Sequence, residues 1–157
     1  MTKIYSHIHP EKLLHIIVRK QDIAEGRTDI CPPEQFLQCA TLRLPKGKTF
    51  KAHQHIWHRV NDDRLAQESW IVLKGMVKLM LYDIDGTLIH TDYIEAGEAS
   101  FTFEGGHNYE IMSEDSLVFE YKTGPYYGQE HDKIYLNVNP GDDTVAIQSA
   151  KAIAKYL

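Results

Sequence analysis

Between residues 35 and 122, hydrophobic and polar positions alternate in short runs that are interrupted roughly every 8–12 positions. The runs include FLQCATLRL, TFKAHQHIW, ESWIVLKG, MVKLMLYD and SLVFEYK, and the interruptions contain Gly, Pro, Asp or Ser, which favour turns. This pattern is typical of a β-sandwich or β-barrel. Because the links are too short for parallel crossovers, we expect antiparallel strands.

The two ends of the chain have other patterns. The run LLHIIVR at 13–19 predicts an additional edge strand. In residues 141–157 the pattern predicts a short C-terminal helix, in which Thr144 can cap the start and one face is apolar: Ala146, Ala150, Ile153 and Leu157. A chain of 157 residues fits one domain, so we expect a single domain over 1–157 with its barrel core at about 36–127.

Composition narrows the classes of partner. The net charge of −5 argues against general nucleic-acid binding, which requires a basic surface. No apolar run approaches the roughly 20 residues that span a bilayer, and the N-terminus lacks the features of a signal peptide. We therefore expect a cytoplasmic protein with a small-molecule ligand, no nucleic-acid or membrane partner, and reduced thiols at Cys31 and Cys39.

The chain contains nine histidines, and two of them have an informative spacing. His53 and His55 are two apart on a predicted strand, so both rings project from one face. His107 begins another predicted strand after a double glycine, and Glu68 begins the strand ESWIVLKG. Imidazole and carboxylate suit zinc, iron, manganese or nickel alike. By itself, the His-x-His pair fits two solvent-exposed histidines equally well.

The residues around these histidines resemble the two cupin motifs. The residues that resemble the first motif are Gly47, His53, His55, Glu68 and Gly75, with six residues between the glutamate and the last glycine. The second is resembled by Gly97, Gly105, Gly106 and His107. The resemblance implies an all-β fold, the double-stranded β-helix or jelly-roll barrel of cupins. It also implies one divalent metal ion (Zn, Fe, Mn or Ni) held by His53, His55, Glu68 and His107.

The match departs from the family between the two halves of the first motif. Twelve residues separate His55 from Glu68, which is more than the family usually has, and the second motif lacks its usual proline. His58 lies in this insertion and Gln67 is the neighbour of Glu68 on the opposite strand face, so either could complete the ligand set instead. We predict Glu68, because its distance to Gly75 is preserved.

Two longer segments resemble a narrower group. LQCATLRLPKGKTFKAHQH and LVFEYKTGPY, the latter followed by Asp132 and Lys133, are similar to small single-domain cupin metalloproteins of O-antigen and lipopolysaccharide gene clusters, the WbuC-like proteins. This resemblance implies a fold, a metal and polar, sugar-like ligands. Cupins commonly form dimers, so it also implies a homodimer, for which the segment 13–19 is available.

Two classes of function fit such a site. In an enzyme, the metal would polarise a substrate oxygen during isomerisation or epimerisation of a sugar-like or small carbonyl compound, or would support a dioxygenase. The alternative is a non-catalytic, small-molecule-binding cupin. Candidates for substrate contact or for orienting a ligand are His58, Arg59, Trp70, Tyr109, Glu120, Lys122 and Tyr126. Each of these side chains also fits an ordinary structural role.

One further motif suggests a different chemistry. Asp83-Ile-Asp85-Gly-Thr resembles the first motif of haloacid-dehalogenase-type phosphatases, in which the first aspartate is the nucleophile. Those enzymes require a parallel α/β fold, whereas residues 87–134 show no helical period. We therefore predict that Asp83 and Asp85 lie in a hairpin turn.

Overall fold

The computed structural model describes residues 1–56 and 65–138. The predicted C-terminal helix at 141–157 and the candidates His58 and Arg59 lie outside the described residues. None of the helices in the described part has the length and apolar content needed to cross a bilayer.

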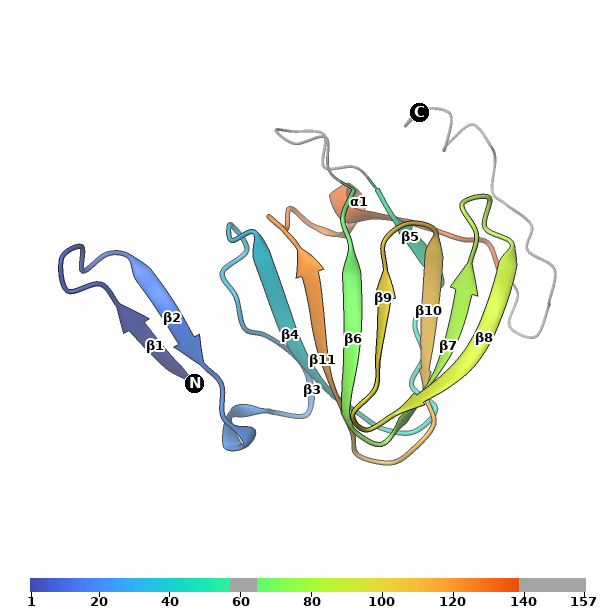
Figure 1. Ribbon diagram of the computed structural model, residues 1–157, viewed down its shortest axis with the longest axis horizontal. Coiled ribbons are helices and arrows are strands. Elements are labelled where there is room, and N and C mark those ends of the chain that lie inside the picture. The colour runs from blue at the N-terminus through green and yellow to red at the C-terminus, as the bar shows by residue number, and fades with distance from the viewer. Residues whose placement is uncertain (57–64, 139–157) are drawn as a thin grey trace.

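Two five-stranded antiparallel sheets form the body of the molecule (Figure 1). One has the order β3 (Gly26–Asp29), β4 (Leu37–Leu44), β11 (Ser116–Thr123), β6 (Glu68–Lys74) and β9 (Ala99–Thr102). The other has the order β12 (Lys133–Tyr135), β5 (His53–His55), β10 (Gly106–Ile111), β7 (Met76–Tyr82) and β8 (Leu88–Glu95). Strands distant in sequence are thus neighbours, and the predicted all-β jelly-roll is confirmed.

The N-terminal segment differs from the prediction. β2 (Leu13–Ile17) pairs with β1 (Thr2–Tyr5) as a separate two-stranded sheet, so the prediction that residues 13–19 form an edge strand of the barrel was wrong. The short link between them lets residues 2–5 supply the partner locally. Figure 1 shows this hairpin set apart from the two sheets.

Several short elements were not predicted. They are β1, the 3₁₀ turn η1 (Lys20–Asp22), β3, α1 (Gln129–Asp132) and β12. Their sequences are too short or too polar to show a period. β3 and β12 each complete one sheet at its edge, so the barrel extends beyond the predicted core of 36–127 at both ends.

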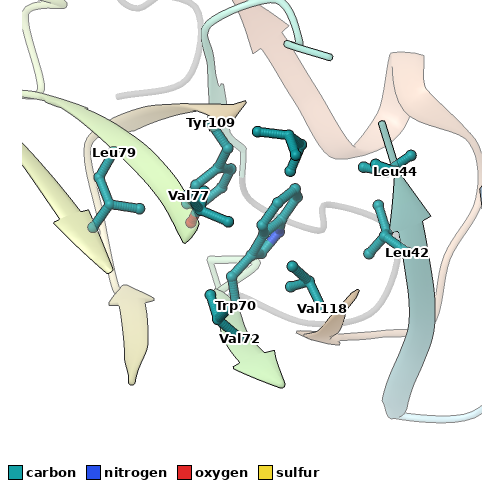
Figure 2. Close-up of a cluster of buried hydrophobic side chains, with 9 residues drawn as sticks. Leu42, Leu44, Trp70, Val72, Val77, Leu79, Tyr109 and Val118 are labelled. Carbon is teal, nitrogen blue, oxygen red and sulfur yellow. The ribbon is translucent and has the colours of Figure 1, made fainter. Parts of the chain in front are cut away.

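The alternating apolar positions of both sheets meet in one core (Figure 2). Its buried members are Leu42, Leu44, Trp70, Val72, Val77, Leu79, Tyr109, Ile111 and Val118. Trp70 is stacked on Tyr109, with ring centroids 4.0 Å apart, and Phe50 contacts the Trp70 ring edge-on at 5.5 Å. Such stacked and edge-on pairs add to the stabilisation gained from burial.

The predicted turn between β7 and β8 is confirmed. The side chain of Asp83 accepts a hydrogen bond from the Ile84 amide (2.7 Å), and that of Asp85 accepts one from the Thr87 amide (2.8 Å). β7 and β8 are antiparallel, and both aspartates are exposed. The parallel arrangement that a phosphatase site requires is therefore not present here, and the two carboxylates act as turn residues.

Candidate metal centre

The four predicted ligands come together inside the barrel. His53 and His55 lie on β5, and His107 lies opposite His53 on the neighbouring strand β10. Glu68 reaches them from the first position of β6 in the other sheet. All four side chains are buried, and their potential ligand atoms lie within 4.8 Å of one another. Such a cluster could hold a metal ion.

The spacing of these atoms is that of neighbouring ligands. The Nε2 atoms of His53 and His107 are 3.2 Å apart. The two carboxylate oxygens of Glu68 lie 3.2 Å from His107 Nε2 and 3.2 Å from His55 Nε2. Ligands at right angles around an ion with bonds of about 2.1 Å are roughly 3 Å apart, so the arrangement fits a small divalent ion.

The outer nitrogens of the histidine rings face other partners. His53 Nδ1 donates to the carbonyl of Lys51 (2.9 Å), and His107 Nδ1 is hydrogen-bonded to the Thr102 hydroxyl (2.9 Å). His55 Nδ1 lies 3.5 Å from a carboxylate oxygen of Asp132. Partners at the outer nitrogen fix the orientation of metal-binding histidines, and here they turn each Nε2 towards the centre.

The surroundings of His55 show whether the four side chains are suited to hold a metal ion. Both of its ring nitrogens are buried, and among the described residues neither has a hydrogen-bond partner of good geometry. A buried nitrogen without a partner is costly. A cation at the centre would take the place of the proton on His55 Nε2 and bind that nitrogen, so the donor set of this chain fits a metal.

Glu68 belongs to the cluster, whereas Gln67 does not. The Gln67 side chain is exposed on the opposite strand face. Glu68 is buried and accepts a hydrogen bond from the indole N–H of Trp70 (3.1 Å). Burial raises the pKa of Glu68, but His107 and His55 outweigh it and hold that pKa well below its usual value, so the carboxylate is ionised.

The pKa values of the two β5 histidines move in opposite directions. Burial, with the nearby His107 and Lys133, lowers the pKa of His53 to about 3. Burial also disfavours the charged form of His55, but the carboxylates of Asp132 and Glu68 outweigh it and raise that pKa to about 9. At neutral pH, therefore, His53 is a neutral ring with a lone pair at Nε2.

The double glycine permits the close chain crossing that places His107. Gly105 has a φ of +80°, and a Cβ on it would lie 2.5 Å from the carbonyl oxygen of Tyr82. A Cβ on Gly106 would lie 2.8 Å from Leu136 Cδ1. A larger residue at Gly105 would push β10 away from the Tyr82 backbone, whereas one at Gly106 would first displace the Leu136 side chain.

A cavity of about 490 Å³ opens beside the cluster, and His53 and Glu68 form part of its wall. Five predicted contact residues also line it, namely Trp70, Tyr109, Glu120, Lys122 and Tyr126. Trp70 and Tyr109 are at the same time core residues, and the Tyr109 hydroxyl is already hydrogen-bonded to Ser100 (3.2 Å).

Most charged groups of the cavity are paired. Arg27 binds both carboxylate oxygens of Glu120 (2.9 and 2.8 Å), so Glu120 contacts an arginine and not a histidine of the cluster. Lys122 donates to Asp132 (3.1 Å) and lies 3.7 Å above the ring of Tyr126. Sequence reasoning assigned no role in the site to Arg27, Asp132 or Lys133, and it used the last two only as part of a family resemblance. No period or spacing connects these residues to the histidines.

No family model matches this sequence, and no curated protein matches it. Among solved structures, the capsular polysaccharide assembling protein CapF from Staphylococcus aureus has a TM-score of 0.58 at 18% identity, and the match covers 85% of this chain and 37% of that one. The Schizosaccharomyces pombe Cnp3 cupin domain has a TM-score of 0.54 at 10% identity, over 78% of this chain and 84% of that one.

KdgF from Halomonas sp. has a TM-score of 0.50 at 18% identity, over 66% of this chain and 81% of that one. Similarity at these identities concerns the fold. Together with the two-sheet jelly-roll and the cluster of three histidines and a glutamate, it identifies the architecture. The chain has the cupin fold.

Proposed function

We propose that this protein is a metal-dependent enzyme that transfers a proton on a small, sugar-like carbonyl or hydroxyl compound, as isomerases and epimerases do. The observation that carries the proposal is the cavity of about 490 Å³, in which two of the candidate ligands and several ionisable side chains share one wall. A divalent ion held by the cluster would polarise a substrate oxygen.

Tyr126 is the side chain to which we assign proton donation. Its phenol would give a proton to the substrate oxygen while the carbon-bound proton leaves to solvent, and solvent would then return a proton to the phenolate. It lines the cavity, and burial raises the pKa of its phenol, which therefore stays protonated near neutral pH. The ammonium of Lys122 lies 3.7 Å above its ring, where it favours the negative charge left after the proton has moved.

A sugar-like substrate is supported by two further points. The cavity has the volume of a small-molecule site. CapF is described as a capsular polysaccharide assembling protein, and this chain covers 37% of its length. A role in the synthesis of surface polysaccharides, as the resemblance to WbuC-like proteins implies, is therefore part of the proposal.

The first experiment measures bound metal by mass spectrometry on untagged protein, alongside His53→Ala and His107→Ala. We expect about one equivalent in the wild type and its loss in both variants without unfolding. His90→Ala is the matched control, because His90 is exposed on β8 and should leave metal content unchanged. A wild type that holds no metal, even after incubation with each candidate ion, would refute the proposal.

The second experiment detects proton transfer. The metal-loaded protein is incubated with a panel of aldoses, ketoses and sugar acids in D₂O, and exchange of carbon-bound hydrogen is followed by NMR. We expect exchange in one substrate, at least a hundredfold slower in Tyr126→Phe. A sugar that stabilises the protein thermally but never exchanges would indicate a binding protein, and consumption of O₂ by the iron form would indicate a dioxygenase.

A further inference from the structure

Lys133 places an ammonium group in the cavity beside the metal cluster. β12 pairs with β5, and Lys133 lies opposite His55 in that pairing. Its side chain lines the cavity, and its Nζ lies 3.2 Å from His53 Nε2. Within residues 1–56 and 65–138, no carboxylate forms an ion pair with it, whereas Arg27 has Glu120 and Lys122 has Asp132.

The contact between Lys133 and His53 uses the same lone pair that a metal would use. His53 donates through Nδ1 to the carbonyl of Lys51, so its neutral ring accepts through Nε2. The ammonium donates to that Nε2 at 3.2 Å. An ion at the centre and Lys133 cannot share one lone pair, so metal binding frees the donors of Lys133 to face the cavity.

The charges at this end of the cavity then require an anion. Glu68 contributes one negative charge, while a divalent ion and Lys133 together contribute three positive charges. Among the other charged residues of the wall, Arg27 is paired with both Glu120 and Asp29, and Lys122 is paired with Asp132. These residues add one negative charge, so an excess of one positive charge remains. Unbalanced charge in a partly buried site is costly, so a ligand that brings negative charge is favoured over a neutral one of the same shape.

We propose that Lys133 binds the carboxylate of the substrate, and that the substrate is therefore a 2-hydroxy or 2-keto acid, sugar acids included. Because Lys133 Nζ lies 3.2 Å from a candidate ligand atom, the anion it binds is adjacent to the oxygen that faces the metal. A carboxylate next to a hydroxyl or carbonyl carbon has this spacing. The inference rests on the proposed metal site and names the substrate class for it.

The test compares glycolate with glycolamide, which has the same shape without the charge. Affinities are measured by calorimetry on nickel-loaded wild type, Lys133→Met, Lys133→Gln and Lys133→Arg, after the metal content of each has been confirmed. Lys46→Met is the matched control, because Lys46 is exposed in the link between β4 and β5.

We expect both neutral variants to bind glycolate about tenfold more weakly than the wild type, as for the loss of one charge-assisted hydrogen bond, with unchanged affinity for glycolamide. Lys133→Arg and Lys46→Met should retain the preference for glycolate. The neutral variants should hold nickel at least as tightly as the wild type, because a competing donor has been removed.

Three results would overturn the inference: no binding of glycolate by metal-loaded wild type, unchanged glycolate affinity in the neutral variants, or equal loss of both ligands. Each of these leaves the metal site standing. A wild type without metal would instead refute the proposed function, and the role of Lys133 with it. Metal content therefore separates the two failures.

Discussion

The side chain of Trp70 contacts both the apolar core and the candidate metal-binding cluster. Its ring is stacked on Tyr109 at 4.0 Å, and its indole N–H donates to Glu68 at 3.1 Å. The position of a candidate ligand thus depends on core packing, and a defect in that packing would reach the cluster directly.

Trp70→Phe should keep the aromatic stack and remove the hydrogen bond to Glu68. We expect a folded protein, destabilised by about 1 kcal/mol or somewhat more, with metal affinity reduced about tenfold. Phe50→Leu is the control, since Phe50 packs edge-on against the same ring, with the centroids 5.5 Å apart. This substitution should lower the stability and leave the metal affinity unchanged. Denaturant unfolding and metal titration measure the two effects; equal metal affinity in all three proteins would contradict the assignment.

Asp115 is a second residue whose contribution can be tested. It forms ion pairs with Arg43 and Lys74, and these two partners hold its pKa at about 2, below the usual value of 3.8. Because the folded-state pKa is lowered, the stabilisation is present above pH 3.8 and is lost as the pH falls towards 2. The pairs are exposed, so added salt should screen them.

Asp115→Asn should remove this part of the acid sensitivity. Asn tolerates the positive φ of 53° at this position, so the backbone is retained. Thermal unfolding between pH 5 and pH 2 should show a smaller loss of stability in the variant than in the wild type at low ionic strength. Parallel curves for the two proteins would show that the ion pairs contribute nothing.

Among the elements, the position of β10 depends on the backbone conformation of Gly105, immediately before the strand. Gly105 combines a positive φ with close approach to the Tyr82 carbonyl, whereas Gly47 has the same φ of +80° with open space around it. An alanine at Gly47 would therefore introduce backbone strain alone, whereas an alanine at Gly105 would introduce the same strain and a steric clash.

Gly105→Ala should destabilise the protein by about 2 kcal/mol or more and shift His107, whereas Gly47→Ala should cost only about 1 kcal/mol. Metal affinity should fall in the first variant and stay unchanged in the second. Denaturant unfolding and metal titration provide the measurements. Identical losses in both variants would mean that the contact with Tyr82 relaxes without effect.

At the scale of the molecule, the N-terminal hairpin leaves large apolar side chains exposed to solvent. A groove of about 460 Å³ lies between β2 and the sheet that contains β4 and β11. Large apolar side chains of the hairpin segment are exposed, namely Ile4, Tyr5, Ile8, Leu14 and Ile17. A two-stranded hairpin is marginally stable alone, and exposed apolar clusters favour association. We propose that a second copy of this chain covers it.

Light scattering of the full chain at micromolar concentration should therefore give the mass of a dimer. Deletion of residues 1–19 should give a monomer that keeps its barrel and its bound metal, because the hairpin forms its own sheet and contributes no candidate ligand. A monomeric mass for the full chain would contradict the dimer.

The sequence by itself determined the strands from β4 to β11 and named all four residues of the cluster, with Gln67 and His58 left as alternatives to Glu68. Both depend on local information: alternation places every second side chain on one face, and a His-x-His pair needs no partner strand to share that face. The turn at 83–86 could likewise be predicted from adjacent residues, because aspartate and glycine favour turns.

Only the tertiary structure decided what depends on contacts between distant segments. Strand register buries Glu68 and exposes Gln67, although a shift of one residue would exchange them. Asp132 and Lys133 reach β5 from nearly 80 residues away, through a short helix and strand without a detectable period. Local pairing of β1 with β2 removed residues 13–17 from the barrel. Periodicity along a chain reports which face a side chain occupies, but which faces meet is fixed by pairing and packing across the whole molecule.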